Sequence, residues 1–274
     1  MRLSVITINL NNYKGLKDTV LSVVSQSFPD YEYIIVDGGS TDGSVPWLQE
    51  ISAQYPSIKW ISEKDRGVFN AMNKGIGMSC GEYLLFLNSG DYLVKSEVLE
   101  RVFSLDSKSE LLLGRLRVSK EGRQLFFLEP KPAYSLEYFY RSSIAHQATF
   151  IHRDLFNRLG FYQEDLRFTG DWAFFLNAIV LNGCTIQPLD IIVTDYNLEG
   201  LSSNQENLKA IQREKERIYD QFHLKNIIPD YKRWEQWHSE YRIMEWAWGK
   251  KYFRIPLKWM YSIINKRAKK RGDR

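Results

Sequence analysis

The feature that most constrains the fold is a regular alternation of apolar runs and helical patterns between residues 1 and 91. The apolar runs, at residues 3–8, 33–36, 58–61 and 83–87, have the length of buried strands, and apolar residues recur at helical spacing in the segments between them. Parallel strands need a crossover connection, which is usually a helix. The alternation therefore predicts an α/β fold with a mostly parallel sheet and helices on both faces.

The second half of the chain has a less regular pattern. Strands are expected at residues 110–118, 124–128, 148–152 and 191–196, a hairpin turn at 120–122, and helices from Asp171 to Leu181 and from Ser203 onward. Gly183 is the expected stop of the first helix. Ser203 and Glu206 have the spacing of a capping box, which would start the second helix.

Four polar loops directly follow the predicted strands, at residues 9–12, 37–42, 62–67 and 88–91. Ligands of such sheets bind beyond the carboxyl ends of the strands, so the loops are expected to share one edge and one site. Their chemistry-bearing side chains are Asn9, Asp37, Asp42, Asp65, Arg66, Asn88 and Asp91, with Asn73 and Lys74 on the following helix. Carboxylate and amide oxygens suit Mg²⁺ or Mn²⁺, which usually bridge a protein to phosphate oxygens.

Known phosphate-binding sequences are absent from the chain. It has neither a Walker A sequence nor a G-x-G-x-x-G after the first strand, so an ATPase loop and a Rossmann dinucleotide fingerprint are not expected. Cys80 and Cys184 are isolated, which supports neither a disulfide framework nor a cysteine metal site. The N-terminal apolar run is too short for a signal peptide, and no run is long enough for a transmembrane helix.

The motifs SVITINLNN (4–12), VDGGSTDGS (36–44), EKDRGVFNAMNKGI (63–76) and GEYLLFLNSGD (81–91) occur in this order and at these spacings. Together they resemble the nucleotide-binding half of a family 2 glycosyltransferase of GT-A fold. The resemblance covers roughly residues 1–200 and is greatest to bacterial members that build capsule, exopolysaccharide or O-antigen. It implies a catalytic domain over 1–202, with a nucleotide-sugar half at 1–95 and an acceptor half at 96–202, followed by a helical extension at 203–274.

The resemblance also implies roles for single residues at the donor site. Thr7 and Asn9 would line the nucleoside pocket, and Asp37 would accept hydrogen bonds from the base, most simply the N–H of uracil. Three further residues would lie by the base or the diphosphate: Asp65, Arg66 and Asn73. Asn88 and Asp91 occupy the position of the family's DXD motif, whose last Asp binds the metal that carries the sugar diphosphate.

Two departures from the family pattern affect these roles. Relatives often have a second Asp where this chain has Gly38, and they usually present two or three acidic residues where it has Asn88, Ser89, Gly90 and Asp91. A divalent cation, Mn²⁺ or Mg²⁺, is expected with Asp91 as its protein ligand, because phosphates and waters can complete the shell of Mg²⁺. Asp91 as a simple turn residue is the alternative.

Inverting transfer needs a base for the attacking hydroxyl. Asp171 begins a predicted helix, and in the family an Asp in this kind of segment is the catalytic base; a plain helix-start residue is the alternative. Trp172 is expected near the sugar or acceptor. His146 is expected in the acceptor site and is the second candidate for the base, while a hydrogen-bonded structural histidine is the alternative.

The last part of the chain is basic and aromatic. Residues 241–274 carry 11 Lys and Arg against 2 Asp and Glu, a net charge of +9 against +4 for the whole chain, which leaves −5 for residues 1–240. Such tracts suit the surface of an anionic membrane, where a lipid-linked acceptor would lie. A single-stranded nucleic acid or a solvated helix are the alternatives, and nucleic acid is not favoured. We expect a cytoplasmic protein, peripheral on the inner face of the cytoplasmic membrane.

The sequence therefore predicts an inverting glycosyltransferase that uses a nucleotide-diphosphate sugar, with UDP favoured by family habit. A sugar nucleotidyltransferase is the enzymatic alternative, but it would need a basic Gly-rich triphosphate loop near the N-terminus, and residues 9–13 do not form one. A non-catalytic module that binds membrane or nucleic acid through the basic tail is the alternative from another class.

Overall fold

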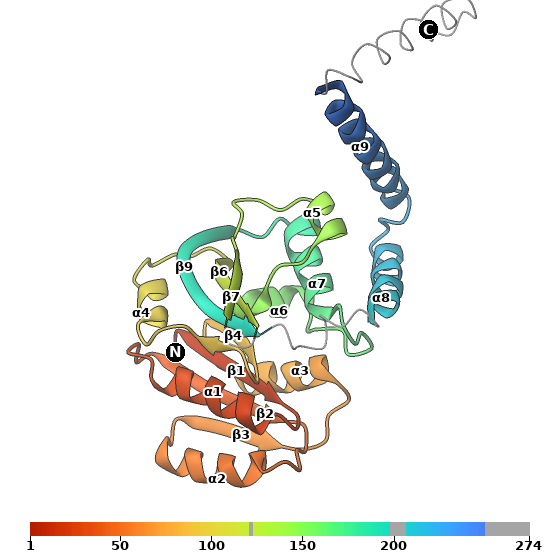
Figure 1. The fold of residues 1–274 in the computed structure, drawn as a ribbon. Coiled ribbons are helices and arrows are strands. Elements are labelled where there is room, and N and C mark those ends of the chain that lie inside the picture. Colours follow the sequence, from red (N-terminus) through yellow and green to blue (C-terminus); the bar gives the residue numbers. More distant parts are fainter. Residues whose placement is uncertain (121–122, 198–206, 250–274) are drawn as a thin grey trace, which may run out of the picture. The chain divides into compact units, whose positions relative to one another are not determined.

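The first half of the chain alternates strands and helices, as predicted. The computed structural model describes residues 1–120, 123–197 and 207–249 (Figure 1). In the first half the strands are β1 (Leu3–Asn9), β2 (Tyr31–Asp37), β3 (Ile58–Ser62) and β4 (Tyr83–Asn88), and the helices are α1 (Tyr13–Val24), α2 (Ser44–Gln54) and α3 (Val68–Met78). Each predicted strand and helix of this half is confirmed within a few residues.

The second half adds shorter elements. In chain order they are β5 (Tyr92–Leu93), α4 (Val98–Phe103), β6 (Leu111–Lys120), β7 (Arg123–Leu128), α5 (Leu136–Arg141), the 3₁₀ turn η1 (His146–Ala148), β8 (Thr149–His152), α6 (Arg153–Leu159), α7 (Gly170–Phe175), the π-helix η2 (Leu176–Leu181) and β9 (Ile186–Asn197). The predicted hairpin is confirmed, since β6 and β7 pair in antiparallel orientation.

All the strands belong to one sheet with the order β3-β2-β1-β4-β8-β6-β9-β5, and β7 pairs with β6. β1, β2, β3 and β4 are parallel neighbours, and the second half is joined through β8, which is antiparallel to both β4 and β6. Asn9 pairs with Asp37, and Ile8 pairs with Asn88. The polar loops after β1, β2 and β4 therefore meet at one edge, as the parallel topology predicts.

Apolar side chains cover both faces of the parallel strands. On one face Val5 and Tyr33 pack with Leu16 and Val20 of α1. On the other face α3 approaches β1 so closely that a Cβ on Gly75 would lie 2.4 Å from the Ile6 side chain. Helices cover both faces of this half, so the strands can be apolar on both sides.

Two predicted elements of the second half differ from the structure, and a third cannot be compared with it. The helix expected from Asp171 to Leu181 is α-helical only to Phe175 and then continues as π-helix. The strand expected at 191–196 begins earlier, at Ile186, because it pairs with β6 along most of its length. The expected capping box of Ser203 and Glu206 lies outside the described residues.

Two helices follow the sheet: α8 (Leu208–Gln221) and α9 (Ile228–Gly249). The chain divides into two compact units, Met1–Ile218 and Tyr219–Arg274, so most of α8 belongs to the first unit. The domain boundary expected between residues 202 and 203 falls in a segment that the structure does not describe, as does the tail from residue 250. No helix in the described parts combines the length and the apolar character that a bilayer crossing requires.

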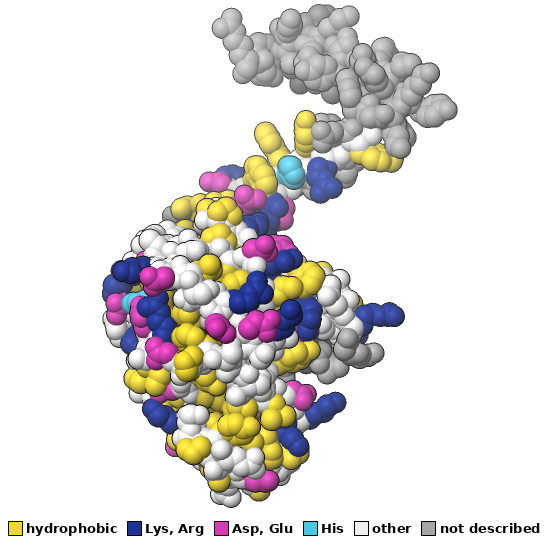
Figure 2. All heavy atoms as spheres, turned by 90° about the vertical axis from the view of Figure 1, so that its left-hand side faces the viewer, with side chains coloured by type: hydrophobic (Ala, Val, Ile, Leu, Met, Phe, Trp, Pro, Cys, Tyr) yellow, Lys and Arg dark blue, Asp and Glu magenta, His cyan; other side chains and the backbone are white. Residues whose placement is uncertain are grey.

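The surface of the first unit carries charges of both signs. On the face drawn in Figure 2, acidic and basic side chains are interspersed among uncharged ones. On this face the described residues form no continuous basic track of the kind that follows a nucleic-acid backbone.

Candidate active site

The loop after β2 is organised around the carboxylate of Asp37, which is fully buried. Its Oδ1 accepts hydrogen bonds from Asn9 Nδ2 at 2.7 Å and Ser40 Oγ at 2.6 Å. Its Oδ2 accepts from Ser62 Oγ at 2.7 Å and from the backbone N–H groups of Gly39 and Ser40 at 3.1 and 2.9 Å. Burial raises the pKa of Asp37, but these hydrogen bonds outweigh it and the net pKa is lowered.

These contacts bear on the role expected for Asp37. Five protein donors use the acceptor capacity of its two oxygens, and the side chain has no exposed surface. The N–H of a base could bind Asp37 only by displacing one of these donors. Asp37 shapes the loop in this structure, and its contact with a base stays a prediction.

Side chains at the end of β1 also contact the loops of this edge. Asn9 donates to Asp37 and accepts from Ser89 Oγ at 2.7 Å, so it ties the loop after β2 to the loop after β4. Thr7 is fully buried and its hydroxyl lies 3.0 Å from the Tyr33 hydroxyl. The Thr7 side chain thus lies in the core of this structure, and its place in a nucleoside pocket stays a prediction.

Asp65 lies where a larger residue at position 38 would put its side chain. A Cβ on Gly38 would be 2.5 Å from Asp65 Oδ2 and 3.3 Å from Leu10 Cδ1. Asp65 Oδ1 accepts from the backbone N–H of Gly67 at 3.0 Å, whereas Oδ2 has no hydrogen-bond donor among the described residues. Leu10 is 58% exposed beside it. A half-buried carboxylate and an exposed apolar side chain thus meet over Gly38.

Glu164 is a residue of this region that the sequence analysis did not identify. Its Oε2 accepts from Arg66 Nη2 at 2.5 Å and Asn70 Nδ2 at 2.9 Å, and its Oε1 accepts from Asn73 Nδ2 at 3.1 Å. The hydrogen bond from Arg66 is the main cause of the lowered pKa of Glu164. Asn73 also holds Tyr162 through both backbone groups.

These contacts show what two of the expected donor-site residues, Asn73 and Arg66, bind in this structure. Asn73 was expected by the base or the diphosphate, but its amide is used to attach the segment that leads toward Asp171. The Arg66 side chain is 78% exposed and is held at its tip by Glu164. Arg66 therefore reaches out from the loop after β3 and remains accessible to a ligand, whereas Asn73 is a structural residue.

The turn after β4 closes on itself through Asp91. The backbone N–H of Asn88 donates to Asp91 Oδ2 at 3.1 Å, and the N–H of Asp91 donates to the Asn88 carbonyl at 2.9 Å. Asp91 is only 4% exposed. Burial raises the pKa of Asp91 to about 7, against the opposing effect of the positive charge of His146.

The same turn has an acceptor atom without a donor. Asn88 Oδ1 is buried and has no hydrogen-bond partner among the described residues. An orphaned buried oxygen and a carboxyl that burial keeps partly protonated both favour a missing positive charge or donor at this position. The described residues contain no group of three or more His, Cys, Asp or Glu that could hold a metal by itself. The turn therefore fits a cation whose other ligands come from phosphate and water.

The imidazole of His146 connects this turn to the start of α7. His146 Nδ1 lies 2.8 Å from Asp171 Oδ2, and His146 Nε2 lies 3.4 Å from the side-chain nitrogen of Asn88. Burial lowers the pKa of His146, but the hydrogen bond and charge of Asp171 and the charge of Asp91 outweigh it, so the net pKa is raised. The imidazole of His146 thus contacts Asn88 from the first half of the chain and Asp171 from the second half.

The start of α7 is held tightly. A Cβ on Gly170 would lie 2.8 Å from the ring of Phe69, so α7 can approach α3 only with glycine there. Asp171 Oδ1 accepts from the N–H of Trp172 at 2.8 Å, and its side chain is 17% exposed. Trp172 is 2% exposed and its Nε1 donates to the Phe139 carbonyl at 2.9 Å. The Trp172 ring is thus part of the core in this structure, and its place near the sugar or acceptor stays a prediction.

A cavity of about 210 Å³ lies between the end of β7, α5 and the residues before η1. Ala145, which precedes His146, lines it together with Tyr134 and Tyr138, whose rings are 4.7 Å apart. The helix α5 that carries Tyr138 also carries Phe139, which packs against Trp172. The cavity is therefore structurally linked to both His146 and Asp171.

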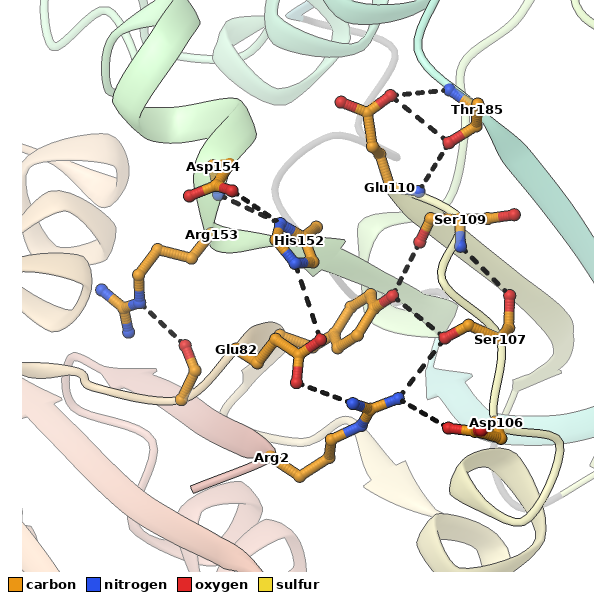
Figure 3. Close-up of polar contacts among 12 residues, drawn as sticks. Arg2, Glu82, Asp106, Ser107, Ser109, Glu110, His152, Arg153, Asp154 and Thr185 are labelled. Carbon is orange, nitrogen blue, oxygen red and sulfur yellow. Dashed lines mark hydrogen bonds and ion pairs between the residues drawn. The ribbon is translucent and has the colours of Figure 1, made fainter.

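A second cavity, of about 300 Å³, lies at the opposite end of the strands, where β4 begins (Figure 3). Its charged side chains pair with each other or with neighbours: Arg158 with Glu110, and His152 with both Glu82 and Asp154. None of the expected site residues lines this cavity. It is a polar network at the amino ends of the strands, and His152 belongs to it.

Comparisons with known proteins agree with this geometry. Residues 4–160 match the family model described as glycosyl transferase family 2. A PGL/p-HBAD biosynthesis glycosyltransferase of Mycobacterium bovis is 30% identical over 207 residues, which cover 73% of this chain and 78% of that protein.

Solved structures share the fold at low sequence identity. Residues 1–349 of S. aureus TarS, solved in complex with UDP-GlcNAc, match with a TM-score of 0.59 and 20% identity over 75% of this chain. A mannosyltransferase from Pyrobaculum calidifontis, solved with GDP-Man and Mn²⁺, matches with a TM-score of 0.58 and 16% identity over 77% of this chain. This chain spans 61% of the length of each of these solved chains.

Proposed function

The chain belongs to glycosyl transferase family 2, and from this premise we propose that it is an inverting hexosyltransferase that uses a nucleotide-diphosphate sugar. The observation that carries the proposal is the imidazole of His146, which lies between Asn88 at the end of β4 and Asp171 at the start of α7. A donor diphosphate at Asn88 and an acceptor hydroxyl at Asp171 would therefore lie on opposite sides of the His146 imidazole. The family membership favours this function over a nucleotidyltransferase and over a non-catalytic module.

At the donor end, the nucleoside would lie over Gly38, between Leu10 and Asp65. Asp65 Oδ2 can accept the N–H of a uracil ring there, the role that was expected of Asp37. Asn9 supports this wall from below, and Arg66 can turn from Glu164 toward the diphosphate. UDP is the nucleotide we propose, and the UDP-GlcNAc complex of TarS is consistent with it.

The diphosphate would lie at the turn after β4. Asn88 Oδ1 is buried without a hydrogen-bond partner among the described residues, and burial raises the pKa of Asp91, so Asp91 would hold a divalent cation and Asn88 would face the diphosphate. A bound Mn²⁺ or Mg²⁺ would neutralise charge on the departing diphosphate. The mannosyltransferase of similar fold was solved with Mn²⁺.

At the acceptor end, Asp171 would take the proton of the attacking hydroxyl. The hydroxyl oxygen forms a bond to the anomeric carbon, the bond from that carbon to the diphosphate breaks, and the diphosphate leaves with the electron pair. The hydrogen bond from His146 leaves acceptor capacity on the Asp171 carboxylate, whose 17% exposure allows the hydroxyl to reach it. His146 is thus the orienting partner of the base and the second candidate for the base itself.

The acceptor would occupy the cavity lined by Tyr134, Tyr138 and Ala145. Aromatic walls suit the faces of a sugar ring or an apolar carrier, which agrees with a glycan or lipid-linked acceptor in cell-surface polysaccharide synthesis. The basic tail over residues 241–274 would hold the enzyme on the inner face of an anionic cytoplasmic membrane. Residues 241–249 belong to α9, on which Trp237 is 78% exposed; the rest of the tail lies beyond the described part.

A thermal-shift panel tests the donor site. UDP, GDP, dTDP and CMP are each added with Mn²⁺, with Mg²⁺ and with EDTA. A ligand at about 100 times its dissociation constant should stabilise the fold by about 2.7 kcal/mol. We expect a metal-dependent shift with UDP that Asp91→Ala abolishes. If the thermal shift with a nucleotide is the same in EDTA as with the metals, the metal is removed from the proposal. If no nucleotide gives a shift, the donor site is overturned.

A further inference from the structure

The helix α8 carries a carboxylate onto the segment that leads to Asp171. Glu214 accepts hydrogen bonds from the backbone N–H groups of Arg167 at 2.8 Å, Phe168 at 3.0 Å and Thr169 at 3.0 Å, and from the Thr169 hydroxyl at 2.9 Å. Thr169 is only 3% exposed. One side chain therefore satisfies three consecutive backbone donors immediately before α7, and it comes from 45 to 47 residues further along the chain.

The next residue of α8 brings a cation to the same place. Lys215 Nζ lies 4.7 Å from the centre of the Trp172 ring. Burial lowers the pKa of Lys215, and the negative charge of Asp171 opposes this effect. Asp165, in the same segment, pairs with Arg217 at 3.0 Å. Figure 1 shows α8 beside α7.

We propose that α8 completes the catalytic site. Glu214 is a positioning residue that fixes the turn at 167–169, and thereby the direction of Asp171 toward His146. Lys215 holds a cation over the ring of Trp172, the residue that follows Asp171. The inference rests on the proposed function for its catalytic meaning, since it assigns two further residues to the same reaction.

The physical reason is that the turn before α7 cannot set its own geometry. Thr169 makes no side-chain cap to α7, and the helix is short, so its first residues need a partner from elsewhere. A carboxylate that accepts several backbone N–H groups is a strong and directional clamp. The base would therefore be held by the helix that follows the catalytic sheet, which makes residues 208–218 part of the enzyme's chemistry.

Charge at the base comes from three elements. The titratable groups that face the pair of His146 and Asp171 are Asp91 after β4, Tyr162 before α7, and Lys215 on α8. Asp91 carries negative charge toward His146, and Lys215 carries positive charge toward Asp171.

The first test uses the full chain without substrate. The imidazole N–H of His146 that faces Asp171 should give a downfield proton resonance in a ¹⁵N-histidine sample, and His146→Gln identifies it among the 4 histidines. We expect the signal in the wild type and in Glu216→Gln, a matched change on the same helix, and its loss or marked shift in Glu214→Gln. An unchanged signal in Glu214→Gln, or no signal in the wild type, would overturn the clamp.

The second test measures UDP release from UDP-GlcNAc. We expect Glu214→Gln and Lys215→Met to lower kcat at least tenfold while the Kd for UDP stays within about twofold. Lys215→Arg should restore most of kcat. The exposed Lys209→Met is the control. Normal kcat in Lys215→Met would overturn the role of Lys215. A wild type without turnover would contradict the proposed function, and the resonance test would still decide the clamp.

Discussion

The carboxylate of Asp65 occupies the space above Gly38: its Oδ2 would lie 2.5 Å from a Cβ at that position. The two residues come from loops after neighbouring parallel strands, β3 and β2. The absence of a side chain at position 38 is therefore what allows an acidic group from the next loop to reach the place where we propose that the nucleoside binds.

The first prediction follows from this contact. Gly38→Ala should push Asp65 aside, which a flexible carboxylate can do at little cost, so we expect less than about 1 kcal/mol of lost stability. The Kd for UDP should rise about as much as in Asp65→Asn, on the order of tenfold for one charge-assisted hydrogen bond. Calorimetric titration of both variants measures this. Unchanged UDP affinity in both would remove Asp65 from the donor site.

The second prediction concerns the base. Asp171→Asn keeps the shape of the side chain but removes its ability to take a proton, so kcat should fall by about 10²- to 10⁴-fold. UDP affinity should be unchanged, because Asp171 lies on the acceptor side. Steady-state rates with UDP-GlcNAc and UDP titrations provide the two numbers. If Asp171→Asn retains its rate and His146→Gln does not, the base is His146.

The third prediction concerns the pH dependence of stability. The pKa of Asp91 is about 7 in the folded ligand-free protein, against about 3.9 in an unfolded chain. Between these values the folded state holds the proton more tightly, so this group lowers the unfolding free energy as pH rises, by at most about 1.4 kcal/mol per pH unit. Asp91→Asn should therefore gain stability relative to the wild type as the pH rises from about 4 to about 7, and the difference should be constant above that range.

Urea unfolding at several pH values, with EDTA present, measures this difference. Parallel stability curves for Asp91→Asn and the wild type would show that Asp91 is not protonated in the fold. With saturating UDP and Mn²⁺ the order should reverse, because only the wild type would then gain from the cation.

The fourth prediction concerns Glu164, which joins α3 to the segment before α7. Glu164→Ala removes the partner of Arg66, Asn70 and Asn73, and we expect a loss of about 1 kcal/mol, since the ion pair is partly exposed. We also expect a lower kcat, because the segment leads to Asp171. Glu63→Ala is the control, since it removes another ion pair to α3, with Lys74 at 2.7 Å. Equal effects of the two changes would contradict a special role for Glu164.

The fifth prediction concerns the basic tail. Replacing Lys258, Lys266 and Arg267 by Glu in the full chain should abolish binding to vesicles that contain phosphatidylserine, because each basic residue near such a surface contributes about 1 kcal/mol. Co-sedimentation at low and high salt measures the binding. Equal binding of the variant and the wild type would remove the membrane from the proposal.

The sequence by itself determined the parallel half of the sheet and the edge at which ligands bind. Apolar runs define β1 to β4, and the first polar residue after each run must lie at the carboxyl end of its strand. Asn9, Asp37 and Asn88 therefore had to gather at one edge. Turn chemistry in the same way predicted the hairpin of β6 and β7.

Only the tertiary structure decided which of these side chains face a ligand. Asp37 and Thr7 stand at the expected positions, but side chains from neighbouring strands occupy their hydrogen-bonding groups. Glu164 and Glu214 had no sequence signal, since their partners lie 45 to 98 residues away. Spacing along the chain sets where a residue is; the packing of distant segments sets what its polar atoms touch, and a site depends on the polar atoms that remain available to a ligand.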